Sequence, residues 1–321
     1  MNNEIMDVII IGGGPAGCAA AIYAARKKLK TLLITESFGG QSIVSDDIQN
    51  WIGEPHISGL DLARKLEGHV KFYSEIEIKI ERAIGTKSMK CPDPTRFCDF
   101  EVQTNAGSYS GKSLVIASGA RRRRLGVPGE DKFEGRGVAF CSTCDAPLFV
   151  NKKVAVIGGG NSGLETVHDL FPYASEIYLL DRGNTIFGDE TTLEEIKKNP
   201  KLKEIILNAQ VLEILGENLV TNIKFKDIKT GEEKNLEVEG IFVEIGSIPN
   251  SEIVKDLVQL DEHKQIMVNF KHATTSHPGV FAAGDVTDDP YRQNNISVGD
   301  GVRAALAAYN YLLKKPKSSP A

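Results

Sequence analysis

Two stretches of the chain show the same succession of apolar and polar residues. Near the N-terminus, the largely β-branched run 7–11 precedes a glycine-rich turn, an Ala-rich run at 18–28 and a second, largely apolar run at 31–35. A short unbroken apolar run is typical of a strand buried on both faces, whereas the Ala-rich run is long enough for a helix. The pattern predicts a strand–turn–helix–strand unit.

The same succession returns in the second half of the chain. Residues 153–157 and 176–180 predict buried strands, and 164–170 predicts the start of a helix between them. Two such units predict an α/β protein with two Rossmann-like dinucleotide-binding domains, the second inserted into the first. Other segments also have clear patterns: 219–226 and 235–242 predict a hairpin around KTGEE, 280–283 a strand and 301–313 a helix.

Each unit carries glycines with the spacing G-x-G-x-x-G. The first set is Gly12, Gly14 and Gly17, and the second set is Gly158, Gly160 and Gly163. The first glycine allows a tight turn, the second lets backbone approach a pyrophosphate, and the third lets helix and strand pack closely. The helix N-terminus adds amide donors and a positive dipole end. We therefore expect a dinucleotide site at each motif.

An acidic residue follows the second strand of each unit. Glu36 and Asp181 stand where a carboxylate can bond the ribose of a dinucleotide. A carboxylate at Asp181 favours a free 2′-hydroxyl and repels a 2′-phosphate, while the neighbouring Arg182 offsets part of that repulsion. The residues therefore favour NADH over NADPH.

Composition narrows the class of protein. A chain of 321 residues suggests about two domains. The net charge is −5 and no long basic tract occurs, so the charge distribution does not indicate binding to nucleic acid or to a membrane surface. We interpret RRRR at 121–124 as a solvated connection. No segment reaches the roughly 20 apolar residues of a membrane span, and no secretory signal is recognised, so we expect a cytoplasmic protein.

The segment CSTCDAP places Cys141 and Cys144 between the two glycine motifs. A zinc site normally needs four ligands, and the sequence offers neither a second C-x-x-C nor a nearby histidine. A structural disulfide is disfavoured in a reducing compartment, and inert thiols need no such spacing. We favour a redox pair and expect no metal. Cys91 and Cys98 are expected to be free thiols in a protruding loop, with a regulatory disulfide as the alternative.

Together these motifs resemble those of the low-molecular-weight thioredoxin reductases, and especially the flavoprotein part of the alkyl hydroperoxide reductase flavin subunit. The resemblance covers essentially the whole chain. It rests on IGGGPAG, FGGQ, LVIASGA, GVPGE, CSTCD, VAVIGGGNSG, EIGSIPN and GVFAAGDV. It implies a homodimer. It also implies an FAD-binding domain of residues 1–119 and 247–321, and an inserted NAD(P)H-binding-like domain of residues 120–246 that carries the C-x-x-C.

The resemblance also implies roles for single residues. It places FAD on the first glycine motif, and the further residues near the flavin dinucleotide are Gln41, Asn50, Asp285, Arg292 and Gln293. It implies that Cys144 faces the flavin, that Cys141 attacks the substrate disulfide and that Asp145 is the acid–base residue. Apolar neighbours of Asp145 favour a raised pKa. Ala146 replaces the family's usual glycine, so strain is expected if that backbone needs a positive φ.

The implied activity is that of an enzyme, a flavin-dependent disulfide reductase. Electrons pass from a reduced nicotinamide through FAD and the thiol pair to a thioredoxin- or glutaredoxin-like protein, and a domain rotation uses hinges at 118–124 and 244–249. Three alternatives stay open. Ferredoxin or a deazaflavin can replace the nicotinamide, a small-dithiol oxidase can use oxygen, and a flavoprotein can sense redox state without turnover.

Overall fold

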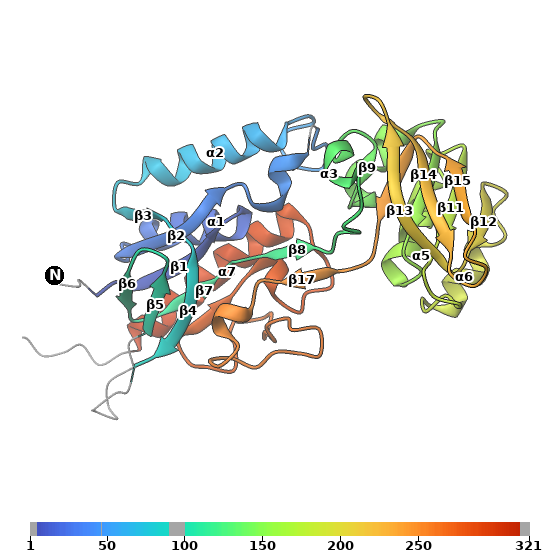
Figure 1. Ribbon diagram of the computed structural model, residues 1–321. Coiled ribbons are helices and arrows are strands. Elements are labelled where there is room, and N and C mark those ends of the chain that lie inside the picture. Colours follow the sequence, from blue (N-terminus) through green and yellow to red (C-terminus); the bar gives the residue numbers. More distant parts are fainter. Residues whose placement is uncertain (1–4, 46, 90–99, 315–321) are drawn as a thin grey trace, which may run out of the picture. The chain divides into compact units, whose positions relative to one another are not determined.

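The computed structural model describes residues 5–45, 47–89 and 100–314. They form an α/β protein in which parallel sheets and helices alternate along the chain, so the predicted fold class is confirmed (Figure 1). The chain divides into two compact units. Unit 1 comprises Met1–Asp47, Trp51–Arg121 and Ile248–Ala321, and unit 2 comprises Ile48–Asn50 and Arg122–Ser247.

Unit 1 is built on a five-stranded parallel sheet with the strand order β18-β7-β1-β2-β3. The strands are β1 (Val8–Gly13), β2 (Thr31–Phe38), β3 (Ile76–Ile80), β7 (Leu114–Ile116) and β18 (Val280–Ala282). Successive residues of β1 point to opposite faces, and both faces are covered. This explains why the run is apolar throughout rather than alternating.

Helices cover one face of this sheet and a small antiparallel sheet covers the other. Val8 and Ile10 pack with residues of α1 (Pro15–Arg26) and α7 (Asn294–Leu313). Ile9 and Ile11 pack on the side of the antiparallel sheet. That sheet contains β4 (Ala83–Ser88), β5 (Phe100–Thr104) and β6 (Ser108–Gly111).

The start of α7 differs from the prediction. We expected a helix over 301–313, but α7 begins at Asn294. Glycine lowers helix propensity, which obscured the first turns of α7 in the sequence. Gly301 has a packing reason: a Cβ there would overlap the carbonyl oxygen of Ala16 in α1. The close approach of two helices therefore overrides the local preference.

Unit 1 has several shorter elements. Its remaining helix, α2 (Gly59–Phe72), starts at a Ser58 cap whose side chain accepts a hydrogen bond from the Asp61 amide. The short elements are η1 (Gly40–Val44), η3 (Glu252–Val254), η4 (Gly284–Val286), β8 (Ala120–Arg122) and β17 (Ser247–Pro249). The chain passes between the units along β8 and β17, which pair with each other.

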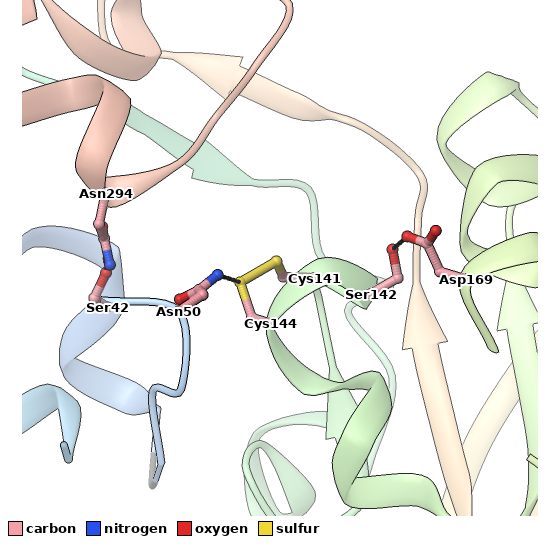
Figure 2. The surroundings of a disulfide bond; sticks show 7 residues. All are labelled: Ser42, Asn50, Cys141, Ser142, Cys144, Asp169 and Asn294. Carbon is pink, nitrogen blue, oxygen red and sulfur yellow. Dashed lines mark hydrogen bonds between the residues drawn. A yellow bond between two sulfur atoms is a disulfide. The ribbon is translucent and has the colours of Figure 1, made fainter. Parts of the chain in front are cut away.

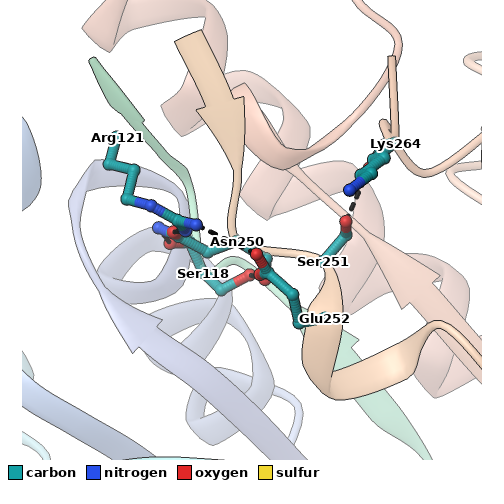
Figure 3. A network of polar contacts seen from close by, with 6 residues as sticks. All are labelled: Ser118, Arg121, Asn250, Ser251, Glu252 and Lys264. Carbon is teal, nitrogen blue, oxygen red and sulfur yellow. Dashed lines mark hydrogen bonds and ion pairs between the residues drawn. The ribbon is translucent and has the colours of Figure 1, made fainter. Parts of the chain in front are cut away.

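Polar contacts fasten these two crossings within unit 1 (Figure 3). The Ser118 hydroxyl donates to the Asn250 carbonyl at 2.8 Å, and the Asn250 amide donates to the Ser118 carbonyl at 2.9 Å. Arg121 donates to Asn250 Oδ1 at 2.7 Å and pairs with Glu252 at 3.0 Å. The segment 118–121 is therefore held against 250–252.

Unit 2 has a second five-stranded sheet, with the order β12-β11-β10-β16-β9 and parallel pairing throughout. Its strands are β9 (Val138–Ala139), β10 (Lys153–Ile157), β11 (Glu176–Leu180), β12 (Leu202–Ile206) and β16 (Gly240–Val243). The predicted strands 153–157 and 176–180 are confirmed. The helices are α3 (Glu130–Phe133), α4 (Ser142–Asp145), η2 (Ala146–Phe149), α5 (Asn161–Leu170) and α6 (Glu190–Ile196).

The faces of this sheet are also covered differently. Val154 and Val156 pack with α5, whereas Ala155 and Ile157 pack with a three-stranded antiparallel sheet. The strands of that sheet are β13 (Ala209–Gly216), β14 (Val220–Asp227) and β15 (Glu233–Glu237). The hairpin predicted around KTGEE is formed by β14 and β15.

The predicted strand 235–242 is wrong as a single element. Strand β15 ends at Glu237, and β16 begins at Gly240 in the parallel sheet beside β10. Residues 238 and 239 connect the two strands, and Gly240 lies against Phe149, whose ring an added Cβ would overlap.

Candidate functional site

Cys141 and Cys144 form a disulfide, with their Cα atoms 5.3 Å apart. Cys141 is the N-cap of α4, and the Asp145 amide donates to the Cys141 carbonyl at 3.0 Å. One helical turn thus brings the two sulfurs together. Asn50 Nδ2 lies 3.9 Å from Cys144 Sγ (Figure 2). In the described part of the chain, no group of three His, Cys, Asp or Glu side chains is arranged to hold a metal ion.

The residue after Cys141 connects the redox turn to another helix. Ser142 is 9% exposed, and its hydroxyl donates to Asp169 Oδ2 at 2.7 Å (Figure 2). Asp169 lies in α5, the helix that begins at the second glycine motif. The turn that carries the disulfide is therefore bound to α5 by a charge-assisted hydrogen bond.

Ala146 has ordinary right-handed backbone geometry, with φ −51° and ψ −38°. An alanine adopts this region without cost. The strain that the sequence suggested at this position is therefore absent.

A carboxyl follows the disulfide directly. Burial raises the pKa of Asp145 to about 6, against the opposing charge of Arg122. Desolvation disfavours the charged form of an acid, so Asp145 exchanges a proton close to neutral pH. This agrees with the raised pKa that its apolar neighbours suggested.

A second carboxyl, Glu244, faces the same guanidinium. Burial raises its pKa to about 7, and Glu165 and Asp145 add to that rise, while Arg122 and a hydrogen bond from Thr166 oppose it. Glu244 directly follows β16, and its carbonyl oxygen is the atom that a Cβ on Gly158 would overlap. The acidic groups are thus gathered around Arg122 beside the second glycine motif.

The run 121–124 is solvent-accessible, as predicted: Arg121, Arg123 and Arg124 are exposed and Arg122 is half-buried. Arg121 is held by Asn250 and Glu252, Arg122 faces Asp145 and Glu244, and Arg124 pairs with Asp131 at 2.8 Å and with Glu134 at 2.7 Å. Three of the four like charges therefore lie near carboxylates, and each of the three has different ones.

The first glycine motif lies between β1 and α1. Gly12 has φ +118°, and a Cβ on it would overlap the Ala117 carbonyl oxygen. A Cβ on Gly17 would overlap the Gly12 carbonyl oxygen. Gly14 is the N-cap of α1, and a Cβ there would meet only Gly40, at 3.7 Å or more. The amino end of α1 is therefore open to a pyrophosphate.

Most of the other residues expected near this motif also belong to unit 1. The Glu36 side chain is 68% exposed, 3.9 Å from Arg82. Asp285 accepts hydrogen bonds from Gln41 Nε2 at 3.5 Å and from Ser297 Oγ at 3.3 Å. Gln293 is the N-cap of α7. Among the described residues, nothing bonds the buried Arg292 Nε, so a donor remains for a ligand acceptor.

The second glycine motif repeats this backbone between β10 and α5. Gly158 has φ +123°, a Cβ on Gly163 would overlap the Gly158 carbonyl oxygen, and a Cβ on Gly160 would meet no atom within 4 Å. Asp181 Oδ2 accepts from the Gly159 amide and Oδ1 from the Gly183 amide, both at 2.6 Å. A carboxylate has about four lone-pair sites, so both oxygens can still accept a ribose hydroxyl.

Sequence reasoning missed Glu244 and Asp169. Glu244 had a signal, because it ends a buried parallel strand, and open α/β sheets bind ligands at that edge. Asp169 had no such signal, because it contacts Ser142 only through the fold, 27 residues away in sequence.

Cys91 and Cys98 lie outside the described residues. Within the described ranges, no helix has both the length and the apolar character needed to cross a bilayer.

Comparison with known proteins places the chain among nicotinamide- and disulfide-linked flavoproteins. It is 41% identical over 314 residues to an NADH dehydrogenase of Bacillus subtilis, which covers 98% of this chain and 60% of the relative. It is 42% identical over 312 residues to an alkyl hydroperoxide reductase subunit from Pseudomonas aeruginosa, which covers 97% of this chain and 59% of the relative. The chain therefore spans about three fifths of the length of these curated relatives.

The fold matches that of a thioredoxin reductase over its whole length. The crystal structure of the enzyme from Streptococcus pyogenes has a TM-score of 0.87 and 34% identity, covering 97% of this chain and 99% of that one. This match confirms a fold with two Rossmann-like domains. The family model for pyridine nucleotide-disulphide oxidoreductases matches residues 6–308, and the chain belongs to that family.

Proposed function

We propose that the protein is a disulfide reductase that passes electrons from NADH through FAD and the Cys141–Cys144 pair to a thioredoxin- or glutaredoxin-like protein. The observation that carries the proposal is the disulfide, with the protonatable Asp145 in the same helical turn and two open glycine motifs in the same chain. The names of the relatives, an NADH dehydrogenase and an alkyl hydroperoxide reductase subunit, support it.

The first glycine motif would hold FAD. In this assignment Gly12, Gly14 and Gly17 form the cradle for the pyrophosphate and Glu36 takes the ribose. The residues that would contact the rest of the cofactor are Gln41, Asn50, Asp285, Arg292 and Gln293. FAD, when bound, accepts a hydride equivalent and supplies two electrons to a disulfide. The FAD-binding domain would be residues 1–119 and 247–321, and the nicotinamide domain residues 120–246.

The thiol pair would carry out the exchange with the protein substrate. Once the Cys141–Cys144 bond has taken up two electrons, the Cys141 thiolate attacks a sulfur of the substrate disulfide and forms a mixed disulfide. Cys144 then attacks Cys141 Sγ, which restores the internal disulfide and releases the substrate as a dithiol. Asp145 gives a proton to the leaving thiolate and takes one back from the pair. Its pKa of about 6 suits both directions near neutral pH.

The choice of NADH rests on Asp181. Its carboxylate is fixed by the Gly159 and Gly183 amides at the end of β11, where it would repel the phosphate of NADPH and accept the 2′-hydroxyl of NADH. Arg182 offsets part of the repulsion between Asp181 and a 2′-phosphate, and the Asp181 carboxylate remains able to accept a hydrogen bond from the 2′-hydroxyl. The second glycine motif, Gly158, Gly160 and Gly163, would hold the pyrophosphate.

The test is anaerobic mixing of the purified yellow protein with NADH and, separately, with NADPH, followed by the absorption of oxidised flavin. Rapid loss of absorption with NADH alone is expected. Loss with NADPH alone contradicts the role of Asp181. If neither nicotinamide reduces the flavin, ferredoxin or a deazaflavin replaces NADH in the proposal.

The acceptor requires a separate experiment. NADH oxidation should become continuous when an oxidised thioredoxin or glutaredoxin is added, and Cys144→Ser should abolish it. Rapid oxygen uptake with a small dithiol would instead identify a dithiol oxidase. We further propose a cytoplasmic homodimer, which analytical ultracentrifugation and fractionation of the source cells would test.

A further inference from the structure

The first of the two residues between the cysteines makes a hydrogen bond that the exchange chemistry does not require. Ser142 is buried, and its hydroxyl donates to Asp169 Oδ2 at 2.7 Å, as Figure 2 shows. Ser142 is also the first residue of α4, directly after the Cys141 cap. A carboxylate from another helix is therefore bound one residue away from Cys141.

Asp169 is held in place independently of the disulfide. It lies near the end of α5, whose Leu164, Val167 and Leu170 are fully buried against the parallel sheet of unit 2. A helix anchored by such a face is rigid compared with a single turn such as α4. The position of the Asp169 charge is thus set by the core and not by the oxidation state of the thiols.

This charge acts on one oxidation state more than on the other. The disulfide is neutral, whereas the reduced pair carries a negative charge when one thiol is ionised. A neighbouring carboxylate disfavours that thiolate, and the Ser142 hydroxyl moderates the effect because it donates to the carboxylate. Asp145 of α4 interacts with Arg122 and with Glu244, and Glu244 in turn interacts with Glu165.

We propose that Asp169 is a positioning residue for the Cys141–Cys144 pair. Through Ser142 it fixes the turn that carries the disulfide, and its charge keeps the pair strongly reducing. The inference rests on the proposed redox role of the two cysteines. It extends that role by naming a residue, distant in sequence, that sets the equilibrium between dithiol and disulfide.

The balance of the reduction step gives the sign of the effect. The disulfide takes up two electrons and two protons to give two thiols, or two electrons and one proton to give a thiol and a thiolate. A carboxylate that disfavours the thiolate lowers the stability of the reduced state. Its removal stabilises the reduced state, and a couple with a more stable reduced state is the stronger oxidant.

Two substitutions separate charge from hydrogen bonding. Asp169→Asn keeps an acceptor for Ser142 and removes the charge, whereas Ser142→Ala keeps the charge and removes its donor. Glu217→Gln is the matched control, because Glu217 is an exposed carboxylate of unit 2 in the turn between β13 and β14. The holoenzymes are equilibrated anaerobically with glutathione buffers, trapped by alkylation and analysed for the peptide that contains 141–144. The peptide readout is needed because the chain has 5 cysteines.

We expect Asp169→Asn to shift the equilibrium towards the dithiol by about threefold to tenfold, where tenfold corresponds to about 30 mV. The pH dependence of alkylation should show a lower pKa for the attacking thiol. Ser142→Ala should leave the equilibrium unchanged or shift it towards the disulfide, and Glu217→Gln should leave it unchanged. An unshifted Asp169→Asn protein overturns the proposal, as does a shift of both Asp169→Asn and Ser142→Ala towards the dithiol, which would mean that the hydrogen bond and not the charge sets the equilibrium. The measurement uses no nicotinamide and no protein acceptor. The role of Asp169 can therefore be refuted while the proposed function holds, and the proposed function can be refuted while the role of Asp169 holds.

Discussion

The two glycine motifs have closely matching backbones and differ in how they use their acidic residue. At both, the first glycine has a left-handed φ, +118° at Gly12 and +123° at Gly158, and an added Cβ would overlap a carbonyl oxygen just after the neighbouring strand. Asp181, however, bonds two backbone amides at 2.6 Å, whereas Glu36 is 68% exposed and 3.9 Å from Arg82. Asp181 is thus fixed to its own loop and keeps lone pairs for a ligand, whereas the Glu36 side chain is exposed to solvent.

This difference shows that a shared sequence pattern fixes the backbone more firmly than the side chain that completes it. The glycine positions follow from overlap of atoms, which leaves no alternative. The hydrogen bonds of the acidic side chain depend on which donors surround it, and the free-energy difference between such arrangements is a few kcal/mol. Substitutions at the two motifs should therefore agree for the glycines and diverge for the acids.

The largest effect is expected at the third glycines. Gly17→Ala and Gly163→Ala each force a Cβ into a backbone carbonyl oxygen and should cost about 3 kcal/mol of folding stability. The first variant should purify without FAD. The second should remain yellow and lose flavin reduction by NADH, which absorption spectroscopy before and after anaerobic mixing would measure.

Gly68→Ala is the control for these two variants. Gly68 lies inside α2, and a Cβ there meets no atom within 4 Å. Alanine at an open helix position should raise stability by about 0.5–1 kcal/mol. Normal flavin reduction by NADH in Gly163→Ala would contradict the assignment of the nicotinamide to the second motif.

The next effect is expected at Asp181. Asp181→Asn has only one acceptor oxygen for the two amides of Gly159 and Gly183, so it should lose about 2 kcal/mol of folding stability. The same change should reduce the preference for NADH over NADPH by about tenfold in kcat/KM, because the repulsion of a 2′-phosphate is removed. Urea denaturation and initial rates with both nucleotides would measure these quantities, and an unchanged preference would contradict the role of Asp181.

The same contrast explains what the sequence could and could not predict. Strands β10 and β11 matched their predicted bounds because buried parallel strands are short and unbroken. The start of α7 was missed because Gly301 serves a contact with α1. The break between β15 and β16 was missed because only two residues separate two strands that belong to different sheets. Local steric requirements leave a trace in sequence, and tertiary contacts often do not.

The residues of the candidate site also divide into those that the sequence could predict and those that it could not. Cys141, Cys144 and both glycine motifs could be identified from spacing alone, since their chemistry is local. The partners of Arg122 and of Ser142 could not, because Glu244 and Asp169 approach from other strands and helices. The exposure of the run 121–124 could be predicted from its four adjacent charges, whereas the carboxylates that approach three of them could not.

A smaller effect is expected from the buried acid beside the second motif. The pKa of Glu244 rises from 4.5 to about 7 on folding, mainly because of burial. Stability contributed by a raised carboxyl pKa is fully present below about pH 4.5 and is lost as the pH rises through about 7. Between these limits the wild-type protein should lose on the order of 2 kcal/mol, and Glu244→Gln should remove that dependence.

The measurement for Glu244 is the urea midpoint from about pH 5 to about pH 8. Glu217→Gln serves again as the control, because this exposed side chain lies outside the cluster around Arg122. Parallel curves for the wild type and Glu244→Gln would show that Glu244 is already ionised at low pH.

The smallest effect on stability is expected at Glu36, and it most sharply tests the contrast between the two acids. The Glu36–Arg82 pair is exposed and 3.9 Å long, so Glu36→Gln should change stability by less than about 0.5 kcal/mol. In the proposed function Glu36 takes the ribose of FAD, so FAD affinity should fall by about tenfold, which corresponds to about 1.4 kcal/mol. Titration of the apoprotein with FAD, followed by flavin fluorescence, would measure the affinity. A loss of stability as large as that of Asp181→Asn would mean that both acids brace the fold and that the contrast is wrong.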